Sequence, residues 1–340
     1  MKRDLPSWAW ALAAFVLLLL FNLAFTPGFA HVEIRDGRLF GSLVDVANRA
    51  APTLLLAIGM TLVIGTGGVD LSVGAVMAIA GTVAACLVAR PTNCPLNAIP
   101  TGKSVPAVAG FAGLAGLLCG LFNGFLVAVV EIQPIVATLL LMVAGRGVAQ
   151  LLSSGQIITF DSPQLAFVGS GSLLYLPTPV WISLSVLLLV AVLARRTAFG
   201  LFVEATGSNL VAARFAGIDS RGIKLIVYAV SGVCAAIAGL IVAADIKAAD
   251  ANNAGLYMEL DAILAVSVGG TALTGGRFSL VGTLLGALLM QSVTTTILTR
   301  GVAPEIALIV KSAIVVVVCV LQSSVVQSEI ARRRMARGAA

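Results

Sequence analysis

Apolar runs long enough to cross a lipid bilayer follow one another along almost the whole chain. The first of them, residues 8–25, contains no charged residue. Hydrophobic residues make up 59% of the 340 residues and charged residues only 11%, whereas soluble domains carry about 25% charged residues. A water-soluble globule of this composition would aggregate. The sequence therefore predicts an all-α, polytopic integral membrane protein.

We expect about ten transmembrane helices, separated by short polar segments. The first run resembles a secretory signal peptide, but no clear small-x-small cleavage site follows it, and we interpret it as a retained span. Several runs are short, so the number of spans can be one higher or one lower than ten. The expected spans lie near residues 8–26, 50–65, 69–89, 105–130, 132–152, 178–194, 222–245, 262–273, 279–299 and 303–322.

The distribution of basic residues predicts the orientation of these spans. With the N-terminus inside, more than half of the 21 Lys and Arg residues lie on the cytoplasmic side, and the predicted outer loops carry more acidic residues. An even number of spans then places both termini in the cytoplasm, with residues 326–340 as a basic tail. The net charge of +6 is thus a sign of topology at the bilayer, and we expect no nucleic-acid partner.

The sequence contains a weak internal repeat. Residues 56–74, LAIGMTLVIGTGGVDLSVG, align with residues 264–282, LAVSVGGTALTGGRFSLVG. The copies share Leu-Ala, Thr-Gly-Gly and Val-Gly at equivalent positions. Membrane transporters are often built from repeats whose helices break at glycines, although glycine-rich apolar sequence also matches itself by chance.

Each copy predicts a helix break. In the first copy, Gly67 and Gly68 release the backbone from the helix, and Asp70 or Ser72 can cap a helix that begins near Val73. In the second copy, the break falls at Gly275 and Gly276. We expect a turn on the cytoplasmic side, with Asp70 as a capping residue rather than a substrate ligand.

The chain lacks the residue sets of a catalytic or metal site. Its five cysteines form no CxxC pair, and there is a single histidine, His31, so we expect no disulfide framework and no metal. Residues 99–104, IPTGKS, end like a phosphate-binding loop, but Asn97 stands where the first glycine belongs and no strand precedes it. We expect no enzyme activity and no nucleotide bound to this chain.

The longest predicted cytoplasmic interruption is the loop 197–221. The sequence from Glu204 to Ile218 predicts two short helices joined at Gly207-Ser208-Asn209, with Asn209 capping the second and Gly217 ending it. Such a helix is suited to docking on a soluble partner. The alternative is an ordinary surface loop.

This loop has the pattern Glu-Ala-x-Gly-x-Asn-x-x-Ala-Ala-x-x-x-Gly-Ile. Together with GTGGVDLSVGAVMA at residues 65–78, it resembles the permease subunits of bacterial sugar ABC importers of the ribose, galactose and xylose class. The resemblance covers nearly the whole chain and is greatest to galactofuranose-type permeases, in stretches such as DGRLFGSLVDVANRAAP at residues 36–52. It implies that residues 1–340 form one transmembrane permease domain in the bacterial inner membrane.

The resemblance implies several partners: a separate ATPase subunit that carries ATP and Mg²⁺, a second permease subunit, identical or related, and a periplasmic sugar-binding protein. It implies no cofactor in this chain. The loop 197–221 becomes the coupling loop, which contacts the ATPase through Glu204, Ala205, Gly207, Asn209, Ala212, Ala213, Arg214, Gly217 and Ile218. The breaks at Gly67, Gly68, Asp70, Ser72, Gly275 and Gly276 become candidates for a gate.

Polar side chains within apolar spans are the candidates for a substrate path. A neutral sugar presents hydroxyl groups, which amide and hydroxyl side chains can bind. The candidates are Asn123, Gln133, Thr138, Gln150, Gln291 and Thr295. Each of them can equally satisfy a helix backbone or a neighbour.

The outer loop 245–261 is the expected contact with the binding protein, through Asp250, Asn252, Asn253 and Glu259. An ordinary solvated loop is the alternative. For the whole chain, the expected function is import of a galactofuranose- or galactose-type monosaccharide. Ribose, xylose or a nucleoside is the alternative substrate, and an ion-coupled secondary transporter is the alternative of another class.

Overall fold

The computed structural model describes residues 8–316 except 27, 36, 92–93, 99–103, 302, 304–305, 307 and 314–315. The predicted basic tail 326–340 and most of the predicted span 303–322 lie outside the described residues. The longer helices are α1 (Ala9–Phe25), α2 (Ser42–Gly65), α3 (Val73–Ala89), α4 (Val105–Ala128), α5 (Pro134–Ser153), α7 (Thr178–Arg196), α10 (Ser220–Ile246) and α12 (Leu280–Thr299). The shorter ones are η1 (Pro95–Ala98), α6 (Pro163–Ser170), α8 (Ala198–Ser208), α9 (Leu210–Phe215) and α11 (Met258–Val268).

Six of these helices, α2, α4, α5, α7, α10 and α12, are long and apolar enough to cross a membrane. A 24-residue helix such as α4 is about 36 Å long, which exceeds the hydrocarbon thickness of a bilayer. α1 and α3 are shorter apolar helices. The prediction of a helical membrane protein is confirmed, and the bounds of these eight helices lie within a few residues of the predicted spans, except that α2 begins at Ser42 rather than near residue 50.

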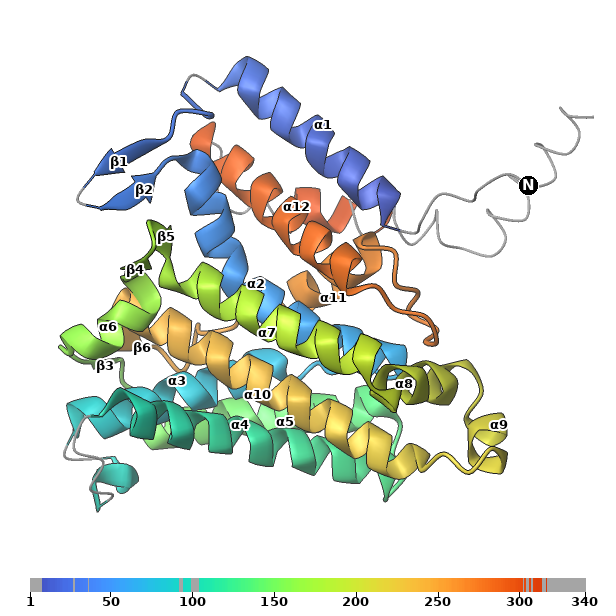
Figure 1. The fold of residues 1–340 in the computed structure, drawn as a ribbon. Coiled ribbons are helices and arrows are strands. Elements are labelled where there is room, and N and C mark those ends of the chain that lie inside the picture. The colour runs from blue at the N-terminus through green and yellow to red at the C-terminus, as the bar shows by residue number, and fades with distance from the viewer. Residues whose placement is uncertain are drawn as a thin grey trace, which may run out of the picture.

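Short strands and small helices mark the two ends of the bundle (Figure 1). One end holds three two-stranded sheets: β1 (Glu33–Arg35) with β2 (Arg38–Phe40), β3 (Ile158–Thr159) with β6 (Ala248–Ala249), and β4 (Ser172–Leu173) with β5 (Leu176–Pro177). The other end holds α8 and α9. Loops that we predicted to share a side therefore do meet, since β3 and β6 come from different predicted outer loops.

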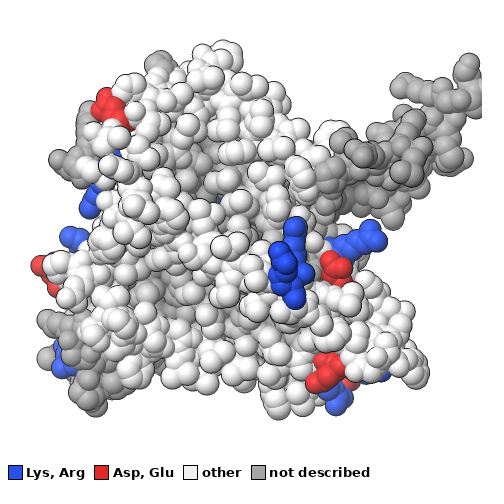
Figure 2. Space-filling view, in the orientation of Figure 1, with Lys and Arg blue, Asp and Glu red and all other residues white. Residues whose placement is uncertain are grey.

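Figure 2 shows the charged side chains gathered toward the two ends of the molecule, with an uncharged band between them. Many apolar side chains of the long helices are exposed, including Val143 at 74% and Leu188 at 66%. Apolar residues exposed all round a helical bundle need a lipid environment. The surface thus fits a bilayer, with the long helices crossing it.

α2 and α10 form the centre of the bundle and are buried over most of their length. α10 packs on α2, α3 and α4, and α2 also packs on α12, α11 and α7. α4, α5 and α7 bury one face and expose the other. The core of the molecule is therefore the α2–α10 contact and the helices around it.

Glycines allow α4 and α10 to approach at backbone distance. A Cβ on Gly120 would overlap the carbonyl oxygen of Tyr228, and one on Gly116 would overlap that of Gly232. Helices in lipid gain little from hydrophobic burial, so close van der Waals packing between small residues must hold them together. These glycines are therefore required by the packing and not by local chain flexibility.

One predicted transmembrane helix is wrong. The prediction placed it near residues 262–273, but the structure has α11, Met258–Val268, with 11 residues. At a rise of about 1.5 Å per residue this helix is about 17 Å long and cannot cross a bilayer by itself. Its acidic residue Asp261 forms an ion pair of 2.7 Å with Lys311. Apolar composition did not distinguish a half-length buried helix from a full span.

The α4–α10 contact can be tested by comparing two glycines of the same helix. We expect Gly120→Ala to lower the free energy of unfolding by about 1–3 kcal/mol, because the new methyl group overlaps the backbone of α10. A Cβ on Gly113 would have no described atom within 4 Å, so Gly113→Ala should raise that free energy by up to about 1 kcal/mol through helix propensity. Unfolding of the purified protein in mixed micelles measures both. Equal effects of the two changes would contradict this packing.

Candidate functional site

A cluster of polar side chains lies buried where α2 ends and α3 begins. Asp70 is 1% exposed, and its Oδ1 accepts hydrogen bonds from Ser72 Oγ at 2.7 Å and from Ser72 N at 3.1 Å. Its Oδ2 accepts one from Ser231 Oγ on α10 at 2.8 Å. Asn123 Nδ2 on α4 donates to Ser72 Oγ at 2.8 Å and to Asp70 Oδ1 at 3.4 Å. We call these four residues the Asp70 cluster.

The cluster lies deeper in the bundle than a turn on one side of the membrane indicates. Ser231 lies about 17 Å along α10 from its first residue, at about 1.5 Å per residue, so Asp70 lies well inside the bundle. The non-helical segment between α2 and α3 carries Asp70 into the bundle. The carboxylate can be buried there because hydrogen-bond donors surround it. Sequence reasoning identified Asp70, Ser72 and Asn123 but missed Ser231, which carries no signal in an apolar helix.

The predicted cap of α3 is partly wrong. The helix begins at Val73 as predicted, and Ser72 is its N-cap residue, but the Ser72 side chain makes no capping bond to α3. Its hydroxyl donates instead to Asp70, because hydrogen bonds to a carboxylate are stronger than those between neutral groups. Asp70 closes the turn before the helix. That it does not contact substrate stays a prediction.

The two predicted helix breaks touch each other. Gly276 N donates to Gly65 O at 3.0 Å, and Gly275 and Gly276 have positive φ values of 88° and 91°. Gly207 of the coupling loop fills the same place, where a Cβ would overlap the carbonyl oxygen of Gly65 and lie 2.6 Å from Gly276 N. The end of α8 therefore sits directly on both breaks. The sequence predicted each of the three segments but not their contact.

The coupling loop has the local structure that its sequence predicts. α8 ends at Ser208, and Asn209 Oδ1 caps α9 by accepting from Val211 N and Ala212 N, both at 3.0 Å. Gly217 ends the segment with a φ of +79°. Ala213 is buried, whereas Phe215 is 88% exposed.

The role of this loop in binding an ATPase stays a prediction. The predicted ATPase contacts are Glu204, Ala205, Gly207, Asn209, Ala212, Ala213, Arg214, Gly217 and Ile218.

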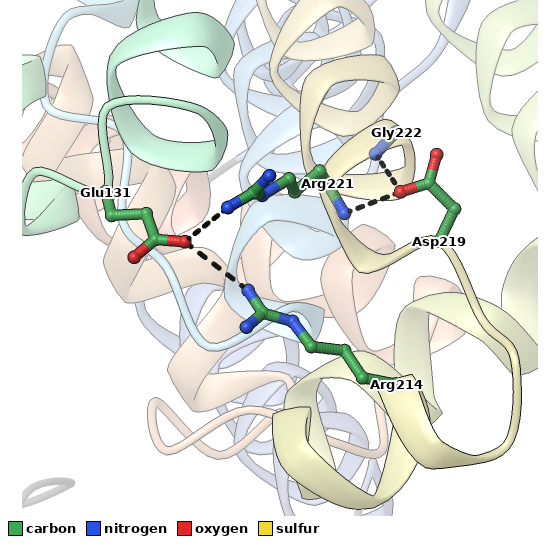
Figure 3. Close-up of polar contacts among 5 residues, drawn as sticks. All are labelled: Glu131, Arg214, Asp219, Arg221 and Gly222. Carbon is green, nitrogen blue, oxygen red and sulfur yellow. Dashed lines mark hydrogen bonds and ion pairs between the residues drawn. The ribbon is translucent and has the colours of Figure 1, made fainter.

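A charged cluster joins α9 to the turn between α4 and α5 (Figure 3). Glu131 Oε1 accepts from Arg221 Nη2 at 3.0 Å and lies 3.6 Å from Arg214 Nη2. Hydrogen bonding and charge attraction from Arg221, with attraction from Arg214, lower the pKa of the Glu131 carboxyl. Sequence reasoning placed Arg214 in the coupling loop but missed Glu131, whose partners are far away in the sequence.

The candidates for a substrate path are only partly brought together. Thr138 Oγ1 donates to Pro134 O at 2.9 Å and reaches Val69 O at 3.4 Å, so Thr138 and Asn123 both lie beside the first break. Gln291 reaches Thr295 one turn along α12, and Gln133 lies at the start of α5, at the end near α9. The structure therefore places Asn123 and Thr138 at one location and the other four elsewhere.

Three of the four predicted binding-protein contacts form one hydrogen-bonded turn. Asp250 Oδ1 accepts from Asn252 N and Asn253 N at 2.9 and 3.2 Å, and Asn253 Nδ2 donates to Asp250 Oδ2 at 2.7 Å. The side-chain bond from Asn253 is the main cause of the lowered pKa of Asp250. Glu259 differs from the others because it is buried, at 3% exposure.

Helix α5 anchors this turn to the bundle. Gln150 Nε2 donates to Asn252 Oδ1 at 2.7 Å, and Arg146 Nη1 donates to Ala251 O and Ala254 O at 3.1 and 2.5 Å. The Arg146 guanidinium thus ties α5 to the backbone of the predicted outer loop.

Within the described part of the chain there is no group of three or more His, Cys, Asp or Glu residues that would hold a metal. Cys86, Cys94, Cys119 and Cys234 are free thiols. The polar groups of the site are hydroxyls and amides around the Asp70 carboxylate, with the Glu131 ion pairs nearby. Hydroxyl and amide side chains of this kind can form hydrogen bonds to the hydroxyl groups of a ligand.

Residues 42–319 match the family described as the permease component of branched-chain amino acid transport systems. The chain belongs to this permease family. The galactofuranose transporter permease of Escherichia coli K12 is 56% identical over 318 residues, which cover 94% of this chain and 90% of that protein.

More distant relatives in this family are also sugar permeases by name. The fructose import permease of Bifidobacterium longum NCC 2705 is 37% identical, over 92% of this chain and 87% of the relative. The ribose import permease of Escherichia coli K12 is 35% identical, over 92% of each chain. No solved structure matches the permease significantly.

The Asp70 cluster predicts a strong effect of one carboxyl on stability. We expect Asp70→Ala to lower the free energy of unfolding by about 3 kcal/mol or more, because several buried donors lose their acceptor. Thr82 on α3 is the matched control, since its buried hydroxyl has no hydrogen-bond partner within the described residues. Thr82→Val should change that free energy by less than about 1 kcal/mol. Chemical unfolding in micelles measures both, and equal losses would contradict the cluster's role.

Proposed function

We propose that this chain is the permease subunit of an ATP-driven sugar importer for a galactofuranose- or galactose-type monosaccharide. The main support is the 56% identity to the galactofuranose transporter permease over nearly the full length of both chains. The ribose and fructose permeases among the relatives support a monosaccharide substrate more broadly. The polar groups at the first break are neutral amides and hydroxyls apart from Asp70, and such groups can bind sugar hydroxyls.

The proposed topology has about ten crossings, with both termini in the cytoplasm of a bacterial cell. α11 and the non-helical residues 269–276 together count as one crossing, because Gly276 reaches the end of the bundle where α8 lies. That end is then cytoplasmic, which the Lys/Arg distribution supports. The sequence repeat reflects a repeat in the fold.

The other end of the bundle is then periplasmic. The turn at Asp250, Asn252 and Asn253, with Glu259 behind it, faces the periplasmic binding protein. A second permease subunit completes the pore.

The proposed mechanism is alternating access driven by a separate ATPase, which carries ATP and Mg²⁺. The exposed side chains of the coupling loop, with Phe215 at 88% and Leu201 at 66% exposure, offer apolar anchors for such a partner. Movement of α8 acts on the two breaks directly, because Gly207 contacts Gly65 and Gly276. The permease itself supplies a path and a gate, and no catalysis.

An ion-coupled secondary transporter is less well supported. Such a protein relays ions through paired acidic groups within its spans. Within the described residues, the Asp70 carboxyl is bonded to hydroxyl, amide and backbone donors of Ser72, Asn123 and Ser231, with no second acid among them. Ribose, xylose and nucleosides are the alternative substrates, and binding of labelled sugars to the cognate periplasmic protein separates them.

Uptake of labelled sugar by cells or proteoliposomes tests this function. We expect uptake to require this chain, the ATPase subunit and the binding protein together. Uptake that persists without the ATPase would contradict an ATP-driven importer. Competition by unlabelled galactofuranose, galactose, ribose and xylose identifies the substrate.

Reversing the charge of Glu204 tests the coupling loop. We expect Glu204→Lys to reduce uptake by at least about tenfold, because a reversed charge at a contact with the partner costs several kcal/mol. Glu204 is partly exposed, so the amount of protein in the membrane should stay normal. Glu204→Gln, which has the same size, should retain more uptake. Unchanged uptake by Glu204→Lys would contradict the coupling role.

A further inference from the structure

Helix α9 is short and has few buried side chains to fix it on the rest of the molecule. It has six residues, and helices of this length are not stable without tertiary contacts. Val211 is 62% and Phe215 88% exposed, and Ala213 is its one buried residue. α9 packs mainly on α8 and α10, which are its neighbours along the chain. Some contact with a distant part of the molecule is needed to fix its position.

Glu131 supplies that contact from the turn between α4 and α5. Figure 3 shows the Glu131 side chain pointing from this turn toward the guanidinium groups of Arg214 on α9 and Arg221 at the start of α10. Both guanidinium groups approach the same oxygen, Oε1. One carboxylate therefore holds the two residues that lie on either side of the 216–219 turn.

The backbone at Glu131 indicates that its side chain is needed there. Glu131 has a φ of +62°, and it follows the last turn of α4, where Val130 N bonds to Phe125 O and Ile132 N to Leu126 O. This left-handed position after a helix favours Gly or Asn. A residue that breaks the local rule and then makes two long-range ion pairs points to a function for the side chain.

The turn that carries Glu131 is connected to the Asp70 cluster through two helices. Asn123, which belongs to that cluster, lies on α4 about one and a half turns before the helix ends at Ala128, close in sequence to Glu131. α10, which begins beside Arg221, carries Ser231 of the same cluster. A displacement of α9 is therefore connected through Glu131 to both helices that hold the buried break.

We propose that Glu131 is a positioning residue for the coupling loop: it ties α9 and the start of α10 to the α4–α5 turn, and so transmits movement of α9 to α4. This proposal rests on the proposed function as an ATP-driven importer. The three side chains are about half exposed, at 57% for Glu131, 49% for Arg214 and 58% for Arg221. Exposed ion pairs contribute little free energy, so this contact can break and reform in each transport cycle.

Hydrogen exchange and transport together test the proposal on the complete permease. We expect Glu131→Gln to speed amide exchange of residues 210–218 by about threefold, because an exposed ion pair gives only modest stabilisation. Reconstituted with its ATPase and binding protein, the same variant should transport fewer sugars per ATP hydrolysed. The KM for ATP should not change, since the nucleotide site is on the partner. Asp161, an exposed acid outside the coupling loop, provides the control variant Asp161→Asn.

Inverting all three charges separates an ion-pair role from a merely structural one. Glu131→Arg alone should speed amide exchange of residues 210–218 further than Glu131→Gln does, and the triple variant Glu131→Arg, Arg214→Glu, Arg221→Glu should return this exchange to the wild-type rate. Failure of the triple variant to recover, or unchanged exchange in Glu131→Gln, would overturn the proposal. Wild-type uptake without the ATPase would instead overturn the proposed function, while the exchange result would still report on α9.

Discussion

A backbone that leaves the helix inside a membrane protein must find new hydrogen-bond partners, and the structure is organised around the place where this happens. Between α2 and α3 the chain is not helical, yet most of this segment is buried. Gly67 N bonds to Ile64 O and Gly68 N to Val63 O, and Tyr228 Oη donates to Val69 O. Asp70 then accepts from the backbone of Ser72. Each of these bonds stabilises an interruption that lipid alone would forbid.

The partners of the break come from helices that are far apart in sequence. Asn123 on α4 and Ser231 on α10 reach the Asp70 cluster only because those two helices pack at backbone distance through Gly116, Gly120 and Gly232. A larger residue at these positions would move the donors away from the carboxylate. The close packing of α4 and α10 and the hydrogen bonds to Asp70 therefore depend on each other, and loss of either would weaken the other.

The same break connects the interior to the end of the bundle where α8 and α9 lie. Gly207 occupies space that any side chain would overfill, against both Gly65 and Gly276. A rigid backbone contact of this kind transmits displacement without needing a strong interaction. The Glu131 ion pairs act nearby through weak, exposed charges instead. The permease thus combines a close backbone contact at α8 with exposed ion pairs at α9.

The sequence alone determined the membrane class, most helix bounds and the local form of the coupling loop, because apolar run length, glycine and caps act over a few residues. Asn209 and Gly217 set α9 in this way. Only the tertiary structure decided that Asp70 is buried among Ser72, Asn123 and Ser231, that α11 is too short to span a bilayer, and that Glu131 meets Arg214 and Arg221. These features depend on which helices become neighbours in space, and packing between residues distant in sequence leaves no local pattern to detect.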